Sequence, residues 1–281
     1  MLVALWGVES DYGKNFGYRP VVQSLATLSC YGKKPAYYEG ELFSALSILQ
    51  RGDVKPDHFV GSWAGAFGHT QFMPSTFLKN AVDVDGNGHP DIVDSVPDAL
   101  GSTAFYLEKS GWTAGQPWGF EVKLPQGYSG PSGRKNRHPM AYWTSRGLRR
   151  VDGSPLGSGA GGLLLPAGRD GPAFLVTTNF EAVFAYNAAE VYALAIGHLS
   201  DRLRGAGPIA TPWPTDDPGL ARVDRRELQE RLAGKGFEVG NRDGVMGTKT
   251  RAAIASYQQS LGMKPDGRAS ESVLKALQDG R

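Results

Sequence analysis

Disulfides and strong net charge are both missing from this sequence. Its one cysteine, Cys30, can form no bond within the chain. This leaves the compartment open, since some proteins of oxidising compartments also lack disulfides. The 30 Lys and Arg residues nearly balance the 28 Asp and Glu residues, for a net charge of +2. A charge this small attracts neither nucleic acid nor anionic membranes strongly, so we expect no nucleic-acid partner.

Long apolar runs and several familiar catalytic motifs are also missing. No run is long enough to cross a membrane as a helix, so we expect no transmembrane segment. The opening "MLVALWG" is too short for a signal peptide and lacks a basic leader. Because helical periodicity starts at Met1, we expect further helices, and any export signal, to lie upstream. The chain has no Gly-rich phosphate loop or serine-hydrolase elbow, and catalytic zinc spacing is not found among His58, His69, His138 and His198.

The pattern of apolar residues divides the chain into parts of different character. Helical periodicity runs over residues 1 to about 112 and returns in "TNFEAVFAYNAAEVYALAIGHLSDRL". Residues 113–177 are rich in Gly and Pro and contain short strand-like pieces, which predicts a β subdomain inserted into a helical domain spanning 1–204. An extended Pro/Gly linker at 205–219 and a compact helical module of three amphipathic segments at 220–281 follow. The predicted fold class is mainly α, with a small β part (α+β).

A carboxylate stands among the apolar residues of the opening stretch "ALWGVESDYG", residues 4–13. Read with a helical period, Glu9 shares one face with Leu5, Val8 and Tyr12. A carboxyl group against apolar neighbours has a raised pKa and can serve as a general acid near neutral pH. A solvated residue or one half of an ion pair is the alternative.

No second carboxylate is placed to work beside Glu9. Asp11 lies about 200° further round the helix and faces away from it. Most glycosidases need two carboxyl groups across the scissile bond, but in substrate-assisted enzymes the sugar itself supplies the nucleophile. One carboxylate is then sufficient.

Small residues and aromatics alternate in "GSWAGAFGHTQFMPSTF", residues 61–77, and a helix is predicted to begin at Pro74. Glycine and alanine allow close approach of either a ligand or another helix, and both explanations stay open here. Gln71 can donate and accept hydrogen bonds to a sugar; the alternative is a loop side chain in water.

The stretch "DVDGNGHPDIVD", residues 83–94, has the spacing of a calcium-binding EF-hand loop. Asp94 stands where a bidentate Glu is usual, so we expect a modest structural site for a hard cation. The alternative is an acidic turn stabilised by bonds from side chains to the backbone. The predicted ligand positions are Asp83, Asp85, Asn87, His89 and Asp94.

Polar and aromatic residues mark the junction of two predicted helices in "FAYNAAEVYALA". Asn187 and Glu190 have the spacing of a helix N-cap and its partner, and capping alone would account for Asn187. Tyr186 and Tyr192 are expected in the core unless the fold brings them to a cleft.

Together these motifs resemble the membrane-bound lytic transglycosylase B family, glycoside hydrolase family 103. The resemblance runs in order over residues 1 to about 204. In the tail, "DGVMGTKTRAAIASYQQSLGMKPDG" resembles the type 1 peptidoglycan-binding module.

The resemblance implies a lysozyme-like fold and cleavage, without water, of the β-1,4 bond between N-acetylmuramic acid and N-acetylglucosamine. It makes Glu9 the catalytic residue, acting as acid and then as base, with no catalytic cofactor and a structural Ca²⁺ in the acidic loop. It implies peptidoglycan glycan strands as partner, a periplasmic location and a monomer. The glycan-contacting residues it implies are Ser62, Gln71, Tyr186, Asn187 and Tyr192.

Two other functions remain open from the residues. A hydrolytic muramidase would use the same Glu9 with water as the acceptor. A non-catalytic protein that binds the cell wall would retain sacculi and release nothing. The first alternative differs in its products, and the second in having none.

Overall fold

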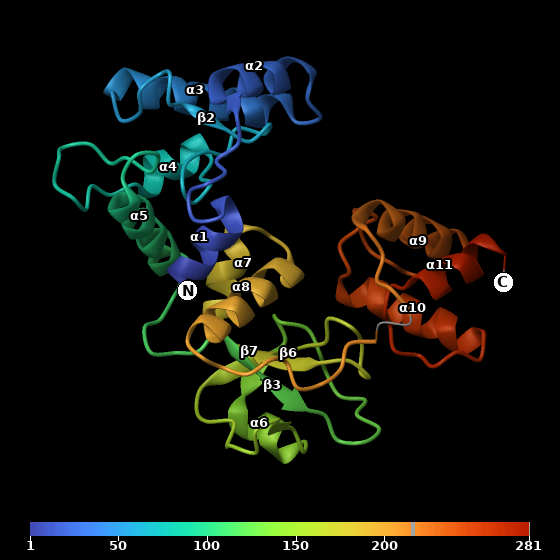
Figure 1. Cartoon of the computed structure of the whole chain (residues 1–281). Coiled ribbons are helices and arrows are strands. Elements are labelled where there is room, and N and C mark those ends of the chain that lie inside the picture. The colour runs from blue at the N-terminus through green and yellow to red at the C-terminus, as the bar shows by residue number, and fades with distance from the viewer. Residues whose placement is uncertain (215–216, 281) are drawn as a thin grey trace. The chain divides into compact units, whose positions relative to one another are not determined.

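The computed structural model describes residues 1–214 and 217–280. The chain forms two compact units (Figure 1). The first comprises Met1–Gln116 and Thr178–Ala206, and the second comprises Pro117–Thr177 and the described residues from Gly207 on. The expected linker 205–219 and module 220–281 include Thr215, Asp216 and Arg281, which lie outside the described residues.

The first unit is helical, apart from a two-stranded antiparallel ribbon of β1 (Arg19–Pro20) and β2 (Val60–Gly61). Its largest core gathers fully buried side chains such as Leu25, Ile48 and Phe67. The helices are α1 (Leu2–Ser10), α2 (Val21–Tyr31), α3 (Pro35–Arg51), α4 (Pro74–Asn80), α5 (Val96–Lys109), α7 (Thr178–Tyr186) and α8 (Glu190–Leu203). Helix α4 begins at Pro74, as the sequence predicts.

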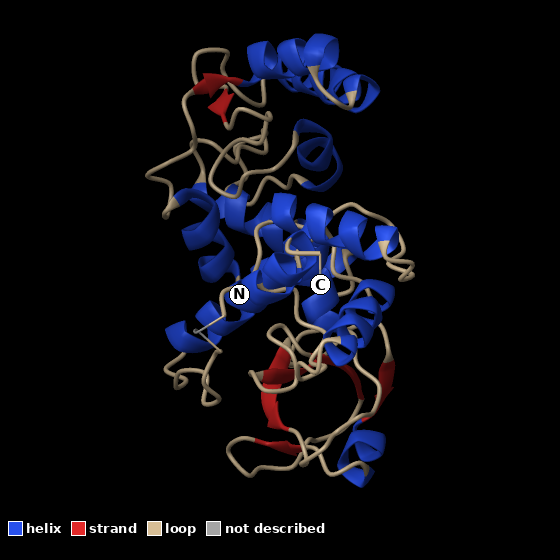
Figure 2. Ribbon diagram, turned by 90° about the vertical axis from the view of Figure 1, so that its right-hand side faces the viewer, coloured by secondary structure: helices blue, strands red, loops and turns tan. Residues whose placement is uncertain are grey.

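The second unit contains the predicted strands, paired antiparallel in the order β4-β6-β7-β3-β5 (Figure 2). Trp143 and Leu175 are fully buried in its core, and the indole N–H of Trp143 donates to the carbonyl of Gly161 at 2.9 Å. The strands are β3 (Gly119–Lys123), β4 (Arg137–Pro139), β5 (Arg149–Arg150), β6 (Ala160–Leu164) and β7 (Ala173–Val176), with helix α6 (Met140–Ser145) between β4 and β5.

The tail forms the three predicted helices, α9 (Arg222–Gly234), α10 (Thr248–Ser260) and α11 (Glu271–Gln278). They share one apolar core that includes Leu228, Ile254 and Val273. The described part of the preceding linker is hydrogen-bonded to strand β3. The backbone N–H groups of Ala210 and Thr211 each donate to the Glu121 carboxylate at 2.7 Å.

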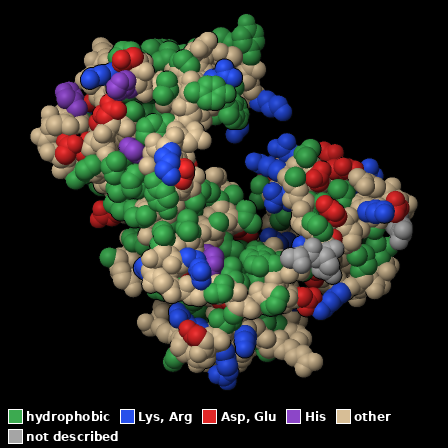
Figure 3. Space-filling model, in the orientation of Figure 1, with side chains coloured by type: hydrophobic (Ala, Val, Ile, Leu, Met, Phe, Trp, Pro, Cys, Tyr) green, Lys and Arg blue, Asp and Glu red, His purple; other side chains and the backbone are tan. Residues whose placement is uncertain are grey.

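The surface agrees with the balanced composition. Acidic and basic side chains are interspersed over the face seen in Figure 3. Over the described residues, no helix is both long and apolar enough to cross a membrane.

A buried carboxylate fixes the start of helix α4, which follows the Gly-rich segment. Glu41 on α3 is only 4% exposed. It accepts the backbone N–H of Ser75 at 2.8 Å and the Ser75 hydroxyl at 2.7 Å. A negative charge at a helix N-terminus is favourable, since the first N–H groups lack partners within the helix.

We expect Glu41→Gln to destabilise the first unit by about 1–3 kcal/mol, because an amide N–H₂ replaces an acceptor in a buried site. Urea unfolding with hydrogen exchange over residues 74–80 measures this. Glu39→Gln, an exposed change on the same helix, is the control and should have little effect. Equal effects of the two changes would show that the hydrogen bonds from Ser75 to Glu41 do not stabilise the start of α4.

Candidate functional site

Glu9 lies on the last turn of α1, facing helix α8. Its side chain is partly buried, and the Tyr192 hydroxyl donates to Glu9 Oε1. Burial raises the pKa of Glu9 above its usual value, and the hydrogen bond from Tyr192 opposes this as the smaller effect. The carboxyl group therefore keeps its proton to a higher pH than an exposed Glu does.

Two tyrosines that the sequence places in the core, unless the fold brings them to a cleft, lie near this carboxyl group: Tyr186 packs against the core of the first unit, and Tyr192 bonds Glu9. Burial, with the nearby Glu9 charge as the second cause, raises the pKa of both Tyr186 and Tyr192. Both hydroxyls remain protonated donors at neutral pH. The Tyr186 hydroxyl donates to the backbone carbonyl of Thr70, so α7 is tied to the Gly-rich segment. The Tyr186 ring packs edge-on against Tyr106, with centroids 5.1 Å apart.

The predicted apolar face of α1 is wrong in part. Val8 is 49% exposed and Tyr12 is 40% exposed, while Leu5 is fully buried. Helix α1 ends at Ser10 because Asp11 and Tyr12 have φ of 49° and 59°, so Tyr12 does not continue the helical face. Apolar residues occur all round this short helix, so periodicity could not identify its buried side.

Gln71 has a left-handed backbone, with φ of 53°, which is uncommon for a residue with a side chain. Its amide Nε2 donates to the carbonyls of Gly68 at 2.9 Å and Phe16 at 3.2 Å. The donors that we expected to face a sugar are thus used inside the protein. What Gln71 can offer a ligand is Oε1, which receives no hydrogen bond from the described residues.

Ser62 shapes the turn that begins the Gly-rich segment. Its Oγ accepts the backbone N–H groups of Ala64 at 3.3 Å and Ala66 at 3.1 Å. The packing explanation for the small residues holds at Gly65, where an added Cβ would lie 2.5 Å from a Leu25 methyl carbon. At Gly68 it would lie 2.5 Å from the backbone oxygen of Ile92.

Asn187 is not the N-cap of the following helix. Helix α8 begins at Glu190, its N-cap position is Ala189, and Asn187 lies exposed in the short connection after α7. The helix starts two residues later than the capping pattern requires, so the Asn187 side chain cannot reach its first N–H groups by that geometry. Capping therefore does not explain this residue.

Sequence reasoning missed three residues that fasten α1 to the Gly-rich segment. The indole N–H of Trp6 donates to His69 Nδ1 at 3.0 Å, and the Ser10 hydroxyl donates to the His69 carbonyl at 2.6 Å. Burial lowers the pKa of His69, which keeps the ring neutral and able to accept. These contacts join positions about sixty residues apart, so no local pattern could have indicated them.

The acidic loop brings together a different set of carboxylates from the predicted one. Oxygens of Asp83, Asp85 and Asp98 lie within 4.8 Å of one another. Two ligands on opposite sides of one Ca²⁺ are about 4.6–5.2 Å apart, so these three fit a single hard cation. The Asp94 carboxylate pairs with His58 Nδ1 at 2.8 Å, and Asp98 is the third carboxylate that the structure brings to Asp83 and Asp85.

Asp98 was missed because it lies beyond the twelve-residue pattern, on the first turn of α5. It is fully buried and accepts backbone N–H groups of the loop, including Val84 at 2.7 Å and Asp91 at 2.9 Å. Backbone N–H donors, that of Gly88 foremost, hold the pKa of Asp83 below its usual range. The loop backbone is therefore folded around the carboxyl groups of Asp83 and Asp98.

Comparison with known proteins identifies the family of each part of the chain. The family described as transglycosylase SLT domain matches residues 1–201. The chain belongs to that family. Residues 222–277 match the family described as putative peptidoglycan binding domain.

Solved structures resemble both parts of the chain. SltB3 from Pseudomonas aeruginosa, in complex with NAG-anhNAM-pentapeptide, is 48% identical with a TM-score of 0.92, covering 99% of this chain and 75% of that chain. The Escherichia coli lytic transglycosylase Slt35, in complex with calcium, is 32% identical with a TM-score of 0.64, covering 72% of this chain and 65% of that chain.

A curated relative matches the first part. Membrane-bound lytic murein transglycosylase B of Escherichia coli strain K12 is 33% identical over 202 residues, which are 71% of this chain and 55% of that protein. The chain spans about half the length of this relative. The match of 202 residues leaves part of the present chain outside that comparison.

The raised pKa of Glu9 predicts a pH-dependent effect on stability. A raised folded-state pKa contributes stability below the usual value of 4.5 that is lost as pH rises through the folded value. Glu9→Gln should therefore unfold at higher urea than the parent at pH 8, and at nearly equal urea at pH 4. Asp11→Asn, at a 64% exposed side chain, is the control and should show no such gain. A Glu9→Gln chain that is no more stable at pH 8 contradicts the buried carboxyl.

Proposed function

We propose that this protein is a lytic transglycosylase of peptidoglycan. It cleaves the β-1,4 bond between N-acetylmuramic acid and N-acetylglucosamine and leaves a 1,6-anhydromuramyl end. The observation that carries the proposal is the Glu9 carboxyl group, whose pKa is raised by burial and which accepts a hydrogen bond from Tyr192. Family membership supports it, as does the likeness to SltB3, solved with a glycopeptide that carries an anhydro sugar.

In the first step, Glu9 donates its proton to the glycosidic oxygen, and the bond from C1 to that oxygen breaks. The N-acetyl group of the muramyl sugar stabilises the positive charge that develops at C1. The Tyr192 hydroxyl orients the Glu9 carboxyl group and, by donating to Oε1, stabilises the carboxylate left by proton transfer.

In the second step, the C6 hydroxyl of the same sugar attacks C1. The Glu9 carboxylate accepts the hydroxyl proton and is returned to its starting state. One residue thus serves as acid and base, and the two steps consume no water. A partly buried site favours this outcome because it limits access of water to C1.

The residues proposed to hold the glycan come from the two segments beside Glu9. Gln71 accepts hydrogen bonds through Oε1, since its N–H groups are used by backbone carbonyls. The exposed Asn187 amide contacts the sugar directly, while Ser62 acts mainly by shaping its turn. Tyr186 positions the backbone at Thr70, and Tyr192 positions Glu9.

The tail is proposed to bind peptidoglycan and so to raise the local concentration of the catalytic part on the polymer. Its match to a peptidoglycan-binding family supports this role. The substrate places the protein in the periplasm, and we propose that it acts as a monomer. No catalytic cofactor enters the proposed reaction.

The acidic loop is proposed to bind one structural Ca²⁺. Asp83, Asp85 and Asp98 provide carboxylates, and Asn87 and the His89 carbonyl complete the oxygen ligands expected from the loop spacing. The calcium complex of Slt35, a relative at 32% identity, supports the choice of cation. Its role would be to neutralise the clustered charge and fix the loop before α5.

Glu9→Gln should abolish the release of anhydromuropeptides from purified sacculi, by about a thousandfold or more, because the acid and the base are both lost. Mass spectrometry of the products measures this, with Asp11→Asn as the control. Reducing ends from the parent enzyme would indicate a hydrolytic muramidase. Binding of sacculi without any release by the parent would indicate a wall-binding protein. Parent-rate turnover by Glu9→Gln would overturn the assignment.

Calcium binding should depend on Asp85 and not on Asp94. Asp85→Asn removes one of three clustered charges and should weaken Ca²⁺ affinity at least about tenfold. Asp94→Asn removes a carboxylate that is paired with His58 and should change affinity less than about twofold. Calorimetry on the metal-stripped chain measures both affinities. Equal losses of Ca²⁺ affinity in the two variants would show that Asp94 is a ligand, as the twelve-residue pattern predicts.

A further inference from the structure

A tryptophan stands exposed at the tip of the turn that opens the Gly-rich segment. Trp63 is 70% exposed, although tryptophan is among the side chains most favoured inside proteins. The turn beneath it is well ordered. The N–H of Gly65 donates to the Ser62 carbonyl at 3.1 Å, and Ser62 Oγ accepts two further N–H groups. The hydrogen-bonded turn thus supports the exposed indole ring of Trp63.

The turn is pressed against helix α2 by close contacts. Gly65 approaches the fully buried Leu25 so closely that a Cβ would not fit. The ribbon pairs Arg19, just before α2, with Gly61, just before the turn. These contacts fix the position of Trp63 relative to one face of α2.

A pocket of about 290 Å³ lies between the indole and that face. Apart from the Leu28 side chain, α2 contributes polar groups to it, one amide and two hydroxyls. The polar side chains follow helical spacing, so they project to one side of α2. The lining comprises Arg19, Gln23, Ser24, Thr27, Leu28 and Trp63.

We infer that this pocket is a distal subsite for a sugar ring of the glycan strand, beyond the sugars bound at Glu9. Sugars combine an apolar face of C–H groups with a rim of hydroxyls. An exposed indole offers a flat surface for the first, and amide and hydroxyl side chains offer donors and acceptors for the second. The inference rests on the proposed function, which requires a long polysaccharide, and on Trp63 and Gln71 belonging to one segment within one compact unit.

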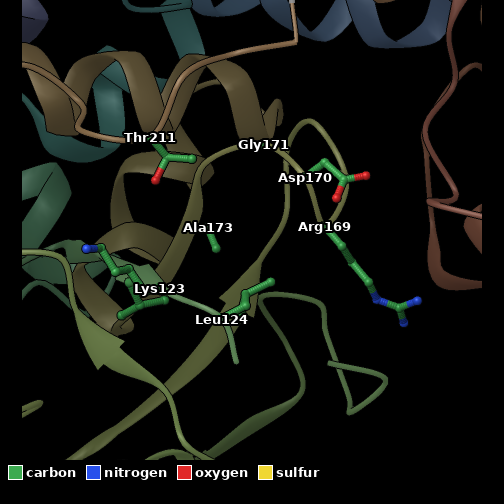
Figure 4. A pocket seen from close by; sticks show the side chains of 8 residues that line it. Lys123, Leu124, Arg169, Asp170, Gly171, Ala173 and Thr211 are labelled. Carbon is green, nitrogen blue, oxygen red and sulfur yellow. The ribbon is translucent and has the colours of Figure 1, made fainter. Parts of the chain in front are cut away.

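A second pocket, in the other unit, differs from the Trp63 pocket in its lining. It measures about 240 Å³, and no aromatic ring is found among its described lining residues (Figure 4). In Figure 4 the Arg169 side chain extends away from the hollow, and Asp170 pairs with Lys264 at 2.6 Å. It offers no stacking surface, so it is not comparable to the Trp63 pocket.

The test uses calorimetric titration of the Glu9→Gln chain with chitooligosaccharides of two to eight N-acetylglucosamine units. The titration measures binding and needs no turnover, so its outcome can be separated from that of the catalytic proposal, and the Glu9→Gln change removes the cleavage which that proposal expects. We expect the affinity for the oligosaccharide to rise once the oligosaccharide is long enough to reach Trp63. Adding Trp63→Ala should remove that rise, weakening the longest oligosaccharide at least about fivefold and leaving the disaccharide unchanged.

Three further variants sharpen the result. Trp63→Phe should restore most of the rise, because a smaller ring still stacks, and Gln23→Ala should remove part of it. Phe43→Ala, at an aromatic side chain 61% exposed on α3, is the matched control and should bind like the parent.

Several outcomes would overturn the subsite. An unchanged dependence on length in Trp63→Ala is one, and an equal loss at every length, or an equal loss in Phe43→Ala, is another. Peptide-bearing muropeptides are titrated in parallel, and a loss in Trp63→Ala that is confined to them would show that Arg19 and Trp63 hold a peptide stem instead of a sugar.

Discussion

The site depends on one interaction, the contact between the Glu9 carboxyl group and the Tyr192 hydroxyl. Burial favours the protonated acid, and the tyrosine donor favours the carboxylate that remains after proton transfer. With both present, one side chain can give up a proton and take it back without either state being prohibitively costly. Placing the carboxyl group so requires α1 to pack against α8, which lies more than 180 residues further along the chain.

The Gly-rich segment connects helices α1 and α7. Its glycines let it lie directly on α2 and beside Ile92, while Thr70 and His69 receive hydrogen bonds from Tyr186 and from Trp6 and Ser10 respectively. Close packing inside the protein and contact with a ligand are therefore not rival explanations for its composition. The small residues fix the backbone; among the larger side chains between them, Phe67 and Phe72 are buried in the core and Trp63 faces outward.

Helix-terminal charges recur as the means of holding the surrounding loops. Glu41 accepts the backbone N–H and the hydroxyl of Ser75 at the start of α4, and buried Asp98 at the start of α5 accepts backbone N–H groups of the acidic loop. In the other unit, Glu121 binds consecutive N–H groups of the linker. Each is a carboxylate that replaces water for donors without partners in regular structure, which gives loops a definite course.

Local pattern in the sequence was enough for most of the helices, for strands β3, β6 and β7, for the start of α4 and for the choice of Glu9 as the unusual carboxylate, because these follow from spacing within one segment. It misjudged the face of α1, where the helix ends early, and it did not indicate Asp98, which lies beyond the twelve-residue pattern. Capping at Asn187, one of two explanations that the sequence left open, is excluded by the late start of α8. Only the tertiary structure decided what lies against Glu9. The desolvation of Glu9 and its hydrogen bond from Tyr192 arise from contacts between segments far apart in the sequence. The periodicity of a single segment therefore cannot indicate them.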